Sequence, residues 1–254
     1  MSTSFVFIAQ LETESTARER ALQRKLGLPL LSLNALDAER HSFYLQYGSD
    51  GLALHAVGES APGALRVDFA SLLRRAGDGL IKQNLLKAVG ARKGRRPSVL
   101  DATAGLGTDS FLLSKAGCEV LALERNAVVY ALVEDGIARY RQAESKGAET
   151  DAVFAVRNED FLSVHSSLPK FQVVYLDPMF PPKTKSAQSK KAMSYLQEIV
   201  GKSSNDADLF DAARELASDR IVVKRAKQSP LINNAEPSHS FKGSSSRFDV
   251  YLLN

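Results

Sequence analysis

Three stretches of the chain place acidic side chains at the ends of apolar segments. Asp101 ends the first segment and is followed by the small-residue turn 102–107, which contains two glycines. Glu124 ends the next apolar segment, about 20 residues further on, and Asp177 ends another and begins the stretch 177–182. Carboxylates at successive strand ends, beside glycines that let the backbone approach a ligand, are typical of sites for nucleotide-like molecules.

The elements that must position these acids alternate along the chain. The pattern predicts strands at 98–101, 119–124, 152–156, 171–176 and 220–224, with helices at 109–116, 127–143, 191–200 and 206–217. Strands separated by helices predict a doubly wound, parallel sheet. The tail at 248–253 predicts one more strand, after the Gly/Ser-rich turn 242–247.

Residues 1–75 are predicted to form a small N-terminal α+β module, and residues 76–254 the larger domain. The stretch 4–9 predicts a strand, 13–27 a helix, and 43–57 a hairpin around a Gly-Ser-Asp-Gly turn. A third strand at 65–69 would complete an antiparallel meander. No residue of this module points to chemistry, so packing or substrate positioning is the interpretation for it.

Several motifs together carry a resemblance to a known family. They are Asp101-Ala-Thr-Ala-Gly-Leu-Gly107, Leu123-Glu-Arg-Asn126, Tyr175-Leu-Asp-Pro-Met-Phe-Pro181, Lys185-Ser-Ala187 and Val222-Val-Lys-Arg225. In this order they resemble the RsmJ family of class I AdoMet-dependent methyltransferases, most closely over residues 90–254. The resemblance implies a Rossmann-like, mostly parallel seven-stranded sheet. It also implies methyl transfer from AdoMet to the exocyclic N2 of a guanosine in 16S rRNA, with S-adenosylhomocysteine as product and no metal.

The same resemblance assigns residues to the cofactor. The glycine turn and the helix start would line the methionine end, Glu124 would accept hydrogen bonds from the ribose hydroxyls, and Arg125 would pack beside the adenine. The acids after the third strand would recognise the adenine amine. The predicted cofactor-binding residues are Asp101, Gly105, Gly107, Thr108, Asp109, Glu124, Arg125, Glu159, Asp160 and Asp177.

The transfer itself is assigned to Asp177, Pro178 and Phe180, which resemble the (Asn/Asp)-Pro-Pro-(Tyr/Phe) motif of amino-methyltransferases. The lone pair of an aromatic amine is delocalised into the ring, so the nitrogen is a poor nucleophile. An acceptor aimed at its N–H bonds favours a more tetrahedral nitrogen and offsets the charge that develops. Asp177, helped by the Pro178 carbonyl, would be that acceptor, and Phe180 would stack on the base.

Cations are predicted to hold the RNA through its phosphates. The candidates are Lys183 and Lys185, in the loop after the transfer motif, and Lys224 and Arg225, at the end of the fifth strand. For the lysine loop a merely solvated surface is an equally weighted interpretation. The same two interpretations stand open for the basic linker 91–97.

Composition limits the alternatives. The net charge of +4 favours a polyanionic partner only weakly, and the single cysteine, Cys118, suits the cytoplasm. No signal peptide, membrane span, metal-binding spacing or protein partner is evident. The family resemblance implies 16S rRNA or the small ribosomal subunit as the partner. Alternatives are an NAD-dependent oxidoreductase, disfavoured because Ser110 replaces the third glycine of its motif, and a non-catalytic RNA-binding protein on the same fold. A further one is an amino-methyltransferase for another nucleic-acid base.

Overall fold

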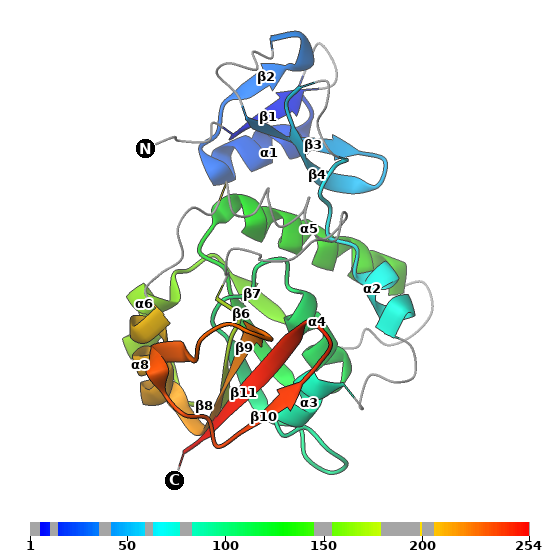
Figure 1. Cartoon of the computed structure of the whole chain (residues 1–254). Helices are drawn as coiled ribbons and strands as arrows, with labels where there is room; N and C mark the ends of the chain where they lie inside the picture. Colours follow the sequence, from blue (N-terminus) through cyan, green and yellow to red (C-terminus); the bar gives the residue numbers. More distant parts are fainter. Residues whose placement is uncertain are drawn as a thin grey trace.

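Two β-sheets organise the molecule, which we describe from a computed structural model. The structure describes residues 6–10, 15–35, 42–58, 63–76, 83–144, 154–178, 199 and 206–253. Figure 1 shows the smaller sheet in an N-terminal module at the top and the larger sheet in the body below it. The long helix α5 (Ala127–Glu144) runs between them.

The larger sheet has seven strands in the order β10-β11-β9-β8-β5-β6-β7. All neighbours from β9 to β7 are parallel, and β11 is antiparallel to both β9 and β10. This is the predicted class I methyltransferase fold with its antiparallel terminal hairpin. The strands are β5 (Ser98–Asp101), β6 (Glu119–Leu123), β7 (Ala155–Arg157), β8 (Phe171–Leu176), β9 (Ala217–Ala226), β10 (His239–Lys242) and β11 (Ser246–Leu252).

Apolar side chains alternate between the two faces of this sheet, and helices cover both. Val173 and Val222 face the core beneath α3, α4 and α5, while Val174 and Ile221 face the core beneath α6 and α8. The helices of the body are α3 (Asn84–Ala88), α4 (Thr108–Lys115), α5, α6 (Phe161–Val164) and α8 (Asp206–Leu216), with 3₁₀ turns η3 (His165–Ser167) and η4 (Ile232–Asn234). The predicted helix at 191–200 lies outside the described residues, apart from Ile199.

The N-terminal module differs from the predicted antiparallel meander. Its sheet has the order β2-β1-β3-β4, in which β1 runs parallel to both neighbours and only β3 and β4 form an antiparallel hairpin. Of the predicted strand 65–69, Leu65 alone makes a bridge, to Leu54. The elements are β1 (Val6–Gln10), α1 (Ala17–Leu26), β2 (Leu30–Ser32), η1 (Leu33–Ala35), β3 (Phe43–Gly48), β4 (Gly51–Ala56) and α2 (Phe69–Ala76).

Helix α2 replaces the third strand because local and tertiary signals agree on a helix there. The Asp68 side chain accepts a hydrogen bond from the amide of Ser71 at 2.9 Å, which caps the first turn. Phe69 then stacks on Phe111 of α4, with ring centroids 4.6 Å apart. The residues before α2 thus end the module, and α2 itself packs on the body of the protein.

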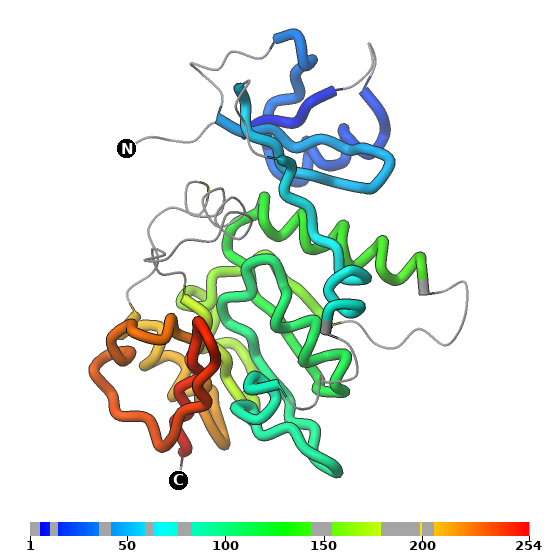
Figure 2. The backbone as a smooth tube through the Cα atoms, turned by 45° about the vertical axis from the view of Figure 1, so that its right-hand side comes forward, coloured from blue at the N-terminus to red at the C-terminus, as the bar shows by residue number. Residues whose placement is uncertain are grey.

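Helix α5 joins the module to the body. The amide of Leu52 on β4 donates to Asp135, and the Arg139 guanidinium bonds both Asp135 and the Val67 carbonyl. Buried side chains of the module and of the body form one continuous hydrophobic cluster. The division of the chain at residue 75 stays a prediction, but the two parts share this core, and Figure 2 shows the chain passing from the module along α5 into α2.

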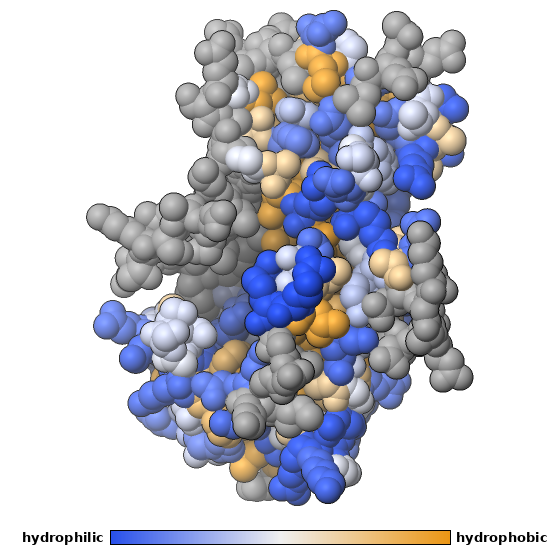
Figure 3. Space-filling view, turned by 90° about the vertical axis from the view of Figure 1, so that its right-hand side faces the viewer, coloured by the Kyte–Doolittle hydropathy of each residue, from blue (hydrophilic) through white to orange (hydrophobic). Residues whose placement is uncertain are grey.

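Surface composition is unremarkable on the face seen in Figure 3, where hydrophilic side chains predominate and apolar ones form small separate areas. Among the described residues, Leu252 is the large apolar side chain that is most exposed, at 46%. None of the described helices combines the length and apolarity that a membrane span requires.

Candidate functional site

The turn between β5 and α4 forms the predicted sharp corner. Gly105 and Gly107 both adopt left-handed backbone angles, with φ of 52° and 70°. A Cβ atom on Gly107 would lie 2.9 Å from the ring of Phe154, so glycine is required there for conformation and for space. At Gly105 no atom of the described residues lies within 4 Å of a Cβ position, so these residues leave that side of the turn open.

Asp101 braces this corner from inside. Its carboxylate is 1% exposed and accepts hydrogen bonds from the Ser110 hydroxyl at 2.5 Å and the Thr103 amide at 3.2 Å. Burial raises the pKa of Asp101 to about 7; the Ser110 hydrogen bond opposes the rise and the Asp109 carboxylate adds to it. Asp101 therefore sits at the corner as predicted, and its hydrogen bonds tie it to the protein itself.

Glu124 links the corner to the next strand. One carboxylate oxygen accepts from the Gly105 amide at 2.9 Å, and the other accepts from the Asn126 amide at 2.7 Å. Burial raises its pKa, against the lowering effect of those two amides. The Asn158 side chain donates to the carbonyls of Glu124 and Arg125, which fixes the loop after β7 against the end of β6. The predicted ribose acceptor thus lies beside the glycine turn.

The loop after β7 presents two further predicted residues. Asp160 caps α6 by accepting from the Leu162 amide at 3.2 Å. The Oε2 atom of Glu159 is buried and has no hydrogen-bond partner among the described residues, and it lies 3.9 Å from the guanidinium of Arg157. A buried acceptor without a donor fits a site that awaits a ligand amine or hydroxyl.

A charged cluster stands at the carboxyl ends of β8 and β9, next to the start of α4. The Lys224 ammonium lies 2.7 Å from Asp109 and 3.0 Å from Asp177, and Asp109 also accepts from the Tyr175 hydroxyl at 2.6 Å. The Asp177 backbone amide donates to the Thr103 hydroxyl at 2.7 Å. The cluster therefore ties Asp177 to the glycine corner.

The acids of this cluster repel one another and share one cation. Burial raises the pKa of Asp177, Lys224 lowers it, and Asp109 raises it further. For Lys224, burial lowers the pKa, but Asp177 and Asp109 outweigh burial, so the pKa lies above its usual range. Burial also raises the pKa of Tyr175, as do Asp109 and Asp177.

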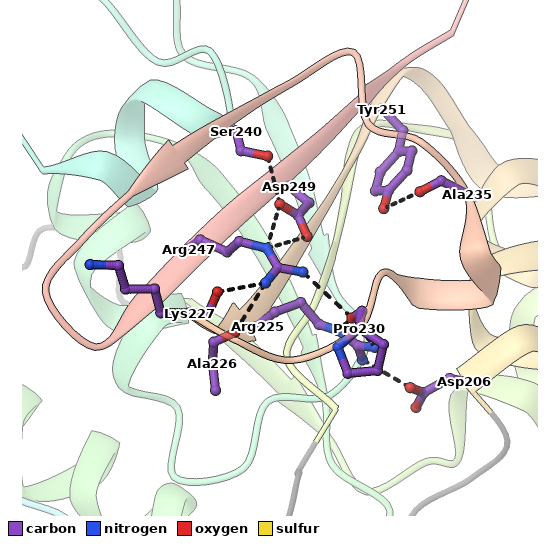
Figure 4. Close-up of polar contacts among 10 residues, drawn as sticks. All are labelled: Asp206, Arg225, Ala226, Lys227, Pro230, Ala235, Ser240, Arg247, Asp249 and Tyr251. Carbon is purple, nitrogen blue, oxygen red and sulfur yellow. Dashed lines mark hydrogen bonds and ion pairs between the residues drawn. The ribbon is translucent and has the colours of Figure 1, made fainter. Parts of the chain in front are cut away.

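The predicted RNA contacts at the end of β9 need correction. Adjacent residues of a strand point to opposite faces: Lys224 joins the acid cluster, and Arg225 points toward α8. The Arg225 side chain is 1% exposed, pairs with Asp206 at 2.8 Å, and donates twice to the Pro230 carbonyl (Figure 4). Arg225 is therefore a buried structural residue rather than a phosphate contact. Lys224 has its two carboxylates as partners instead of an open surface.

Figure 4 also shows a second group of polar contacts near Arg225. Beside it lies a second buried pair, in which Arg247 donates to both oxygens of Asp249 at 2.9 and 3.0 Å. The Ser240 hydroxyl donates to Asp249 as well, at 2.6 Å. With the bonds that Arg247 donates to the carbonyls of Ala226 and Lys227, these contacts join β10 and β11 to the end of β9.

The remaining predicted residues divide into three groups. Thr108 and Arg125 are exposed near the mouth of the corner. Phe180, Lys183 and Lys185 lie outside the described residues. Pro178 is buried and follows Asp177 directly. The sequence analysis did not assign a role to Thr103 or Tyr175. The Thr103 hydroxyl accepts from the Asp177 amide, and the Tyr175 hydroxyl donates to Asp109. Both residues belong to the quoted motifs, where a hydroxyl group among apolar side chains is the signal that could have identified them.

The basic linker 91–97 lies away from the glycine corner. Arg92 and Arg95 bridge to form a tight turn, and Arg95 pairs with Asp219 at 2.8 Å. The turn precedes the amino end of β5, whereas the corner follows its carboxyl end. The linker therefore lies at the opposite edge of the sheet from the site, roughly 10 Å or more away by strand rise. No group of three metal-binding side chains occurs within the described part of the chain.

Comparison with known proteins agrees with this geometry. Residues 29–253 match the family described as "Putative SAM-dependent methyltransferase". A ribosomal RNA small subunit methyltransferase J from Pseudomonas savastanoi pv. phaseolicola is 42% identical over 90% of this chain and 84% of its own length. One of the same name from Pseudomonas aeruginosa PAO1 is 41% identical, over 96% and 93%.

A solved structure gives the same result. A SAM-dependent methyltransferase from Neisseria gonorrhoeae matches with a TM-score of 0.72 at 30% identity, over 97% of this chain and 95% of that one. These matches confirm the resemblance to the RsmJ family and decide against an NAD-dependent oxidoreductase. The chain belongs to the ribosomal RNA small subunit methyltransferase J family of SAM-dependent methyltransferases.

Proposed function

We propose that this enzyme transfers a methyl group from AdoMet to the exocyclic N2 of a guanosine in 16S rRNA, in the cytoplasm. Family membership supports small-subunit rRNA as the substrate. The observation that carries the choice of an amino group is Asp177 at the end of β8, anchored beside the glycine corner through Thr103. A carboxylate in that position suits an amine, because it accepts hydrogen bonds from the nitrogen that is to be methylated.

The described residues fit AdoMet. The turn at Gly105 is open on one side, Glu124 lies beside it with two acceptor oxygens, and Glu159 offers a buried acceptor without a donor. Thr108 and Asp109 begin α4, whose first amides favour the carboxylate of an amino-acid end. Bound there, AdoMet supplies an electrophilic methyl group on a positively charged sulfur. The surrounding acids complement that charge.

The chain's own residues prepare the base. Among the described residues, only Oδ2 of Asp177 is engaged, by Lys224, so Oδ1 is available to accept an N–H of the target amine. That hydrogen bond draws the nitrogen toward a tetrahedral geometry and offsets the positive charge that develops on it. The Pro178 carbonyl is proposed as a second acceptor and Phe180 as the stacking partner, with Lys183 and Lys185 on RNA phosphates.

The test is transfer of labelled methyl to 30S particles that lack the modification, followed by nucleoside analysis. We expect N2-methylguanosine as the labelled product. We expect Asp177→Asn, which keeps the size but loses the charge, to reduce single-turnover transfer by about 100-fold or more. A different labelled nucleoside would refute the proposed base. Near-normal transfer by Asp177→Asn would refute the role of the carboxylate and leave the backbone carbonyl as the acceptor.

A further inference from the structure

We propose that Lys224 is a positioning residue for methyl transfer: it holds one oxygen of Asp177 from the neighbouring strand and separates that carboxylate from Asp109. This inference rests on the proposed role of Asp177 in the transfer. It gives Lys224 a function inside the site, in place of the phosphate contact that its sequence neighbourhood suggested.

The geometry places Lys224 where three elements meet. Its ammonium bonds Asp109 at the start of α4 and Asp177 at the end of β8, while its own backbone belongs to β9. The side chain is 28% exposed, and those of Asp109 and Asp177 are 15% and 39% exposed. Asp177, the most accessible of the three, is the one that must reach a substrate.

The orientation of Asp177 is fixed from two sides. Its backbone amide donates to the Thr103 hydroxyl at 2.7 Å, which fixes the position of the Asp177 backbone. Lys224 then binds Oδ2 at 3.0 Å, which sets the rotation of the carboxyl group and directs Oδ1 away from the ammonium. Misplacement of a reacting group by about 1 Å can cost about 100-fold in rate. A carboxylate without Lys224 would be free to turn.

Electrostatic repulsion between the acids is the second reason to assign Lys224 a positioning role. The charged groups that contact Lys224 are Asp109 of α4 and Asp177, which follows β8. Asp101 of β5 and Tyr175 of β8 interact in turn with both of these acids. Three of these groups are carboxylic acids, and Lys224 is the cation that bonds two of those acids in the described cluster. Without it, Asp109 and Asp177 would repel each other in a partly desolvated space, and the pKa of Asp177 would rise. A protonated Asp177 is a weaker acceptor for the amine.

A double-mutant cycle tests whether Lys224 acts through Asp177. The variants are Lys224→Met, Asp177→Asn and the double variant, with single-turnover transfer measured at saturating AdoMet. We expect Lys224→Met to slow transfer by about 10- to 100-fold in the native background. In the Asp177→Asn background it should have little further effect, because the charge that it orients is gone. Equal effects in both backgrounds would overturn the proposal.

Two more variants control for folding and charge. Lys224→Arg keeps the cation and should restore part of the rate lost in Lys224→Met. Lys227→Met removes an exposed cation just after the same strand and should leave transfer unchanged. S-adenosylhomocysteine binding and thermal unfolding of each variant show that the site is still formed. Equal rates for Lys224→Arg and Lys224→Met in folded protein would contradict a role for the positive charge.

The pH profile separates positioning from a merely structural role. Loss of Lys224 should move the acid limb of the transfer rate to higher pH, by about 1 unit or more, because one opposite charge within 4 Å lowers an acid's pKa by about 1–3 units. An unmoved limb would count against the proposal. The wild-type product nucleoside is identified first. An unexpected nucleoside would refute the proposed base, while the cycle would still test Lys224.

The salt dependence of RNA binding tests whether Lys224 contacts RNA phosphates. If Lys224 lies within the acid cluster, Lys224→Met should leave the slope of RNA affinity against salt unchanged, since the variant still neutralises the same number of phosphates. A slope reduced by about one unit, with the transfer rate intact, would return Lys224 to the RNA surface and overturn the proposal.

Discussion

At the scale of single residues, four of the acids in the site have different surroundings and therefore different tasks. Asp101 is enclosed and bonded by the corner that it braces. Asp109 and Asp177 share the Lys224 ammonium, and Glu124 receives backbone amides on both oxygens. The same functional group thus serves as a support, a charge partner and an acceptor. The hydrogen-bond partners and the burial of each carboxyl group decide which of these roles it has.

Asp101 should make the stability of the protein depend on pH. Its pKa is about 7 in the folded protein, whereas that of an aspartate in an unfolded chain is about 4. Between these values the folded state holds a proton that the unfolded state has released, so the contribution of Asp101 to stability falls as pH rises from about 4 to 7. Asp101→Asn should therefore lose less Tm than the wild type between pH 5 and pH 8. Parallel losses in calorimetric scans would show that Asp101 ionises normally.

Glu124 should contribute to cofactor affinity. Glu124→Ala removes the predicted acceptor of the ribose hydroxyls and the two bonds that hold the Gly105 and Asn126 amides. We expect AdoMet binding to weaken by about 1.5–3 kcal/mol, the range for hydrogen bonds to a charged group. Titration calorimetry measures this, and Glu124→Gln, which keeps the acceptor oxygen, should lose less. An unchanged Kd in Glu124→Ala would place the ribose elsewhere.

At the scale of elements, local signals predict more than long-range ones. The sequence places β5 and β8 at the residues that the structure shows, and α4 and α5 within one residue, because an apolar run or a helical period is contained in the segment itself. Strand neighbours depend on distant residues. For that reason the sequence does not predict the parallel pairing of β1 with β2 and β3. The strand predicted at 65–69 is wrong for a local reason, because Asp68 caps a helix.

In the candidate site, too, features contained in one segment were predictable and contacts between segments were not. The glycine corner and the acids at the strand ends were predictable, because each lies within one motif. The partners of Lys224 and Arg225 were not, because they come from other elements. Strand alternation was nevertheless available from the sequence. Two adjacent residues of β9 cannot both face one crevice, which is sufficient to reject a shared RNA role.

Arg225 should therefore matter for stability and not for RNA. It ties β9 to Asp206, the first residue of α8, and to the Pro230 carbonyl. Arg225→Met fills similar space but leaves those acceptors without their donor, which should lower the free energy of unfolding by about 1–3 kcal/mol. Denaturant titration measures the loss. The double variant with Asp206→Asn should recover part of it, and an Arg225→Met protein of native stability with weakened RNA binding would reverse our interpretation.

At the scale of the whole molecule, the module and the body behave as one structure. Lys25 of α1 pairs with Glu134 of α5 and lies over the Tyr130 ring, 4.6 Å from its centroid. Together with the Asp135 and Arg139 contacts, this connects the module to the same helix that follows β6 and Glu124. The N-terminal module thus packs on α5, the helix that follows the end of β6.

The position of cations around the molecule, more than the net charge of +4, should govern RNA binding. Lys183 and Lys185 follow the transfer motif, whereas Arg92 and Lys93 are exposed in the turn at the opposite edge of the sheet. Both pairs carry the same charge, which makes the second a matched control for the first. Replacing Lys183 and Lys185 with alanine should reduce the slope of log affinity against log salt by about one unit for each phosphate that is no longer neutralised. Binding isotherms to a 16S rRNA fragment at several salt concentrations measure the slope. The same change at Arg92 and Lys93 should leave it as in the wild type, and equal reductions for the two pairs would mean that RNA responds to overall charge and not to the site.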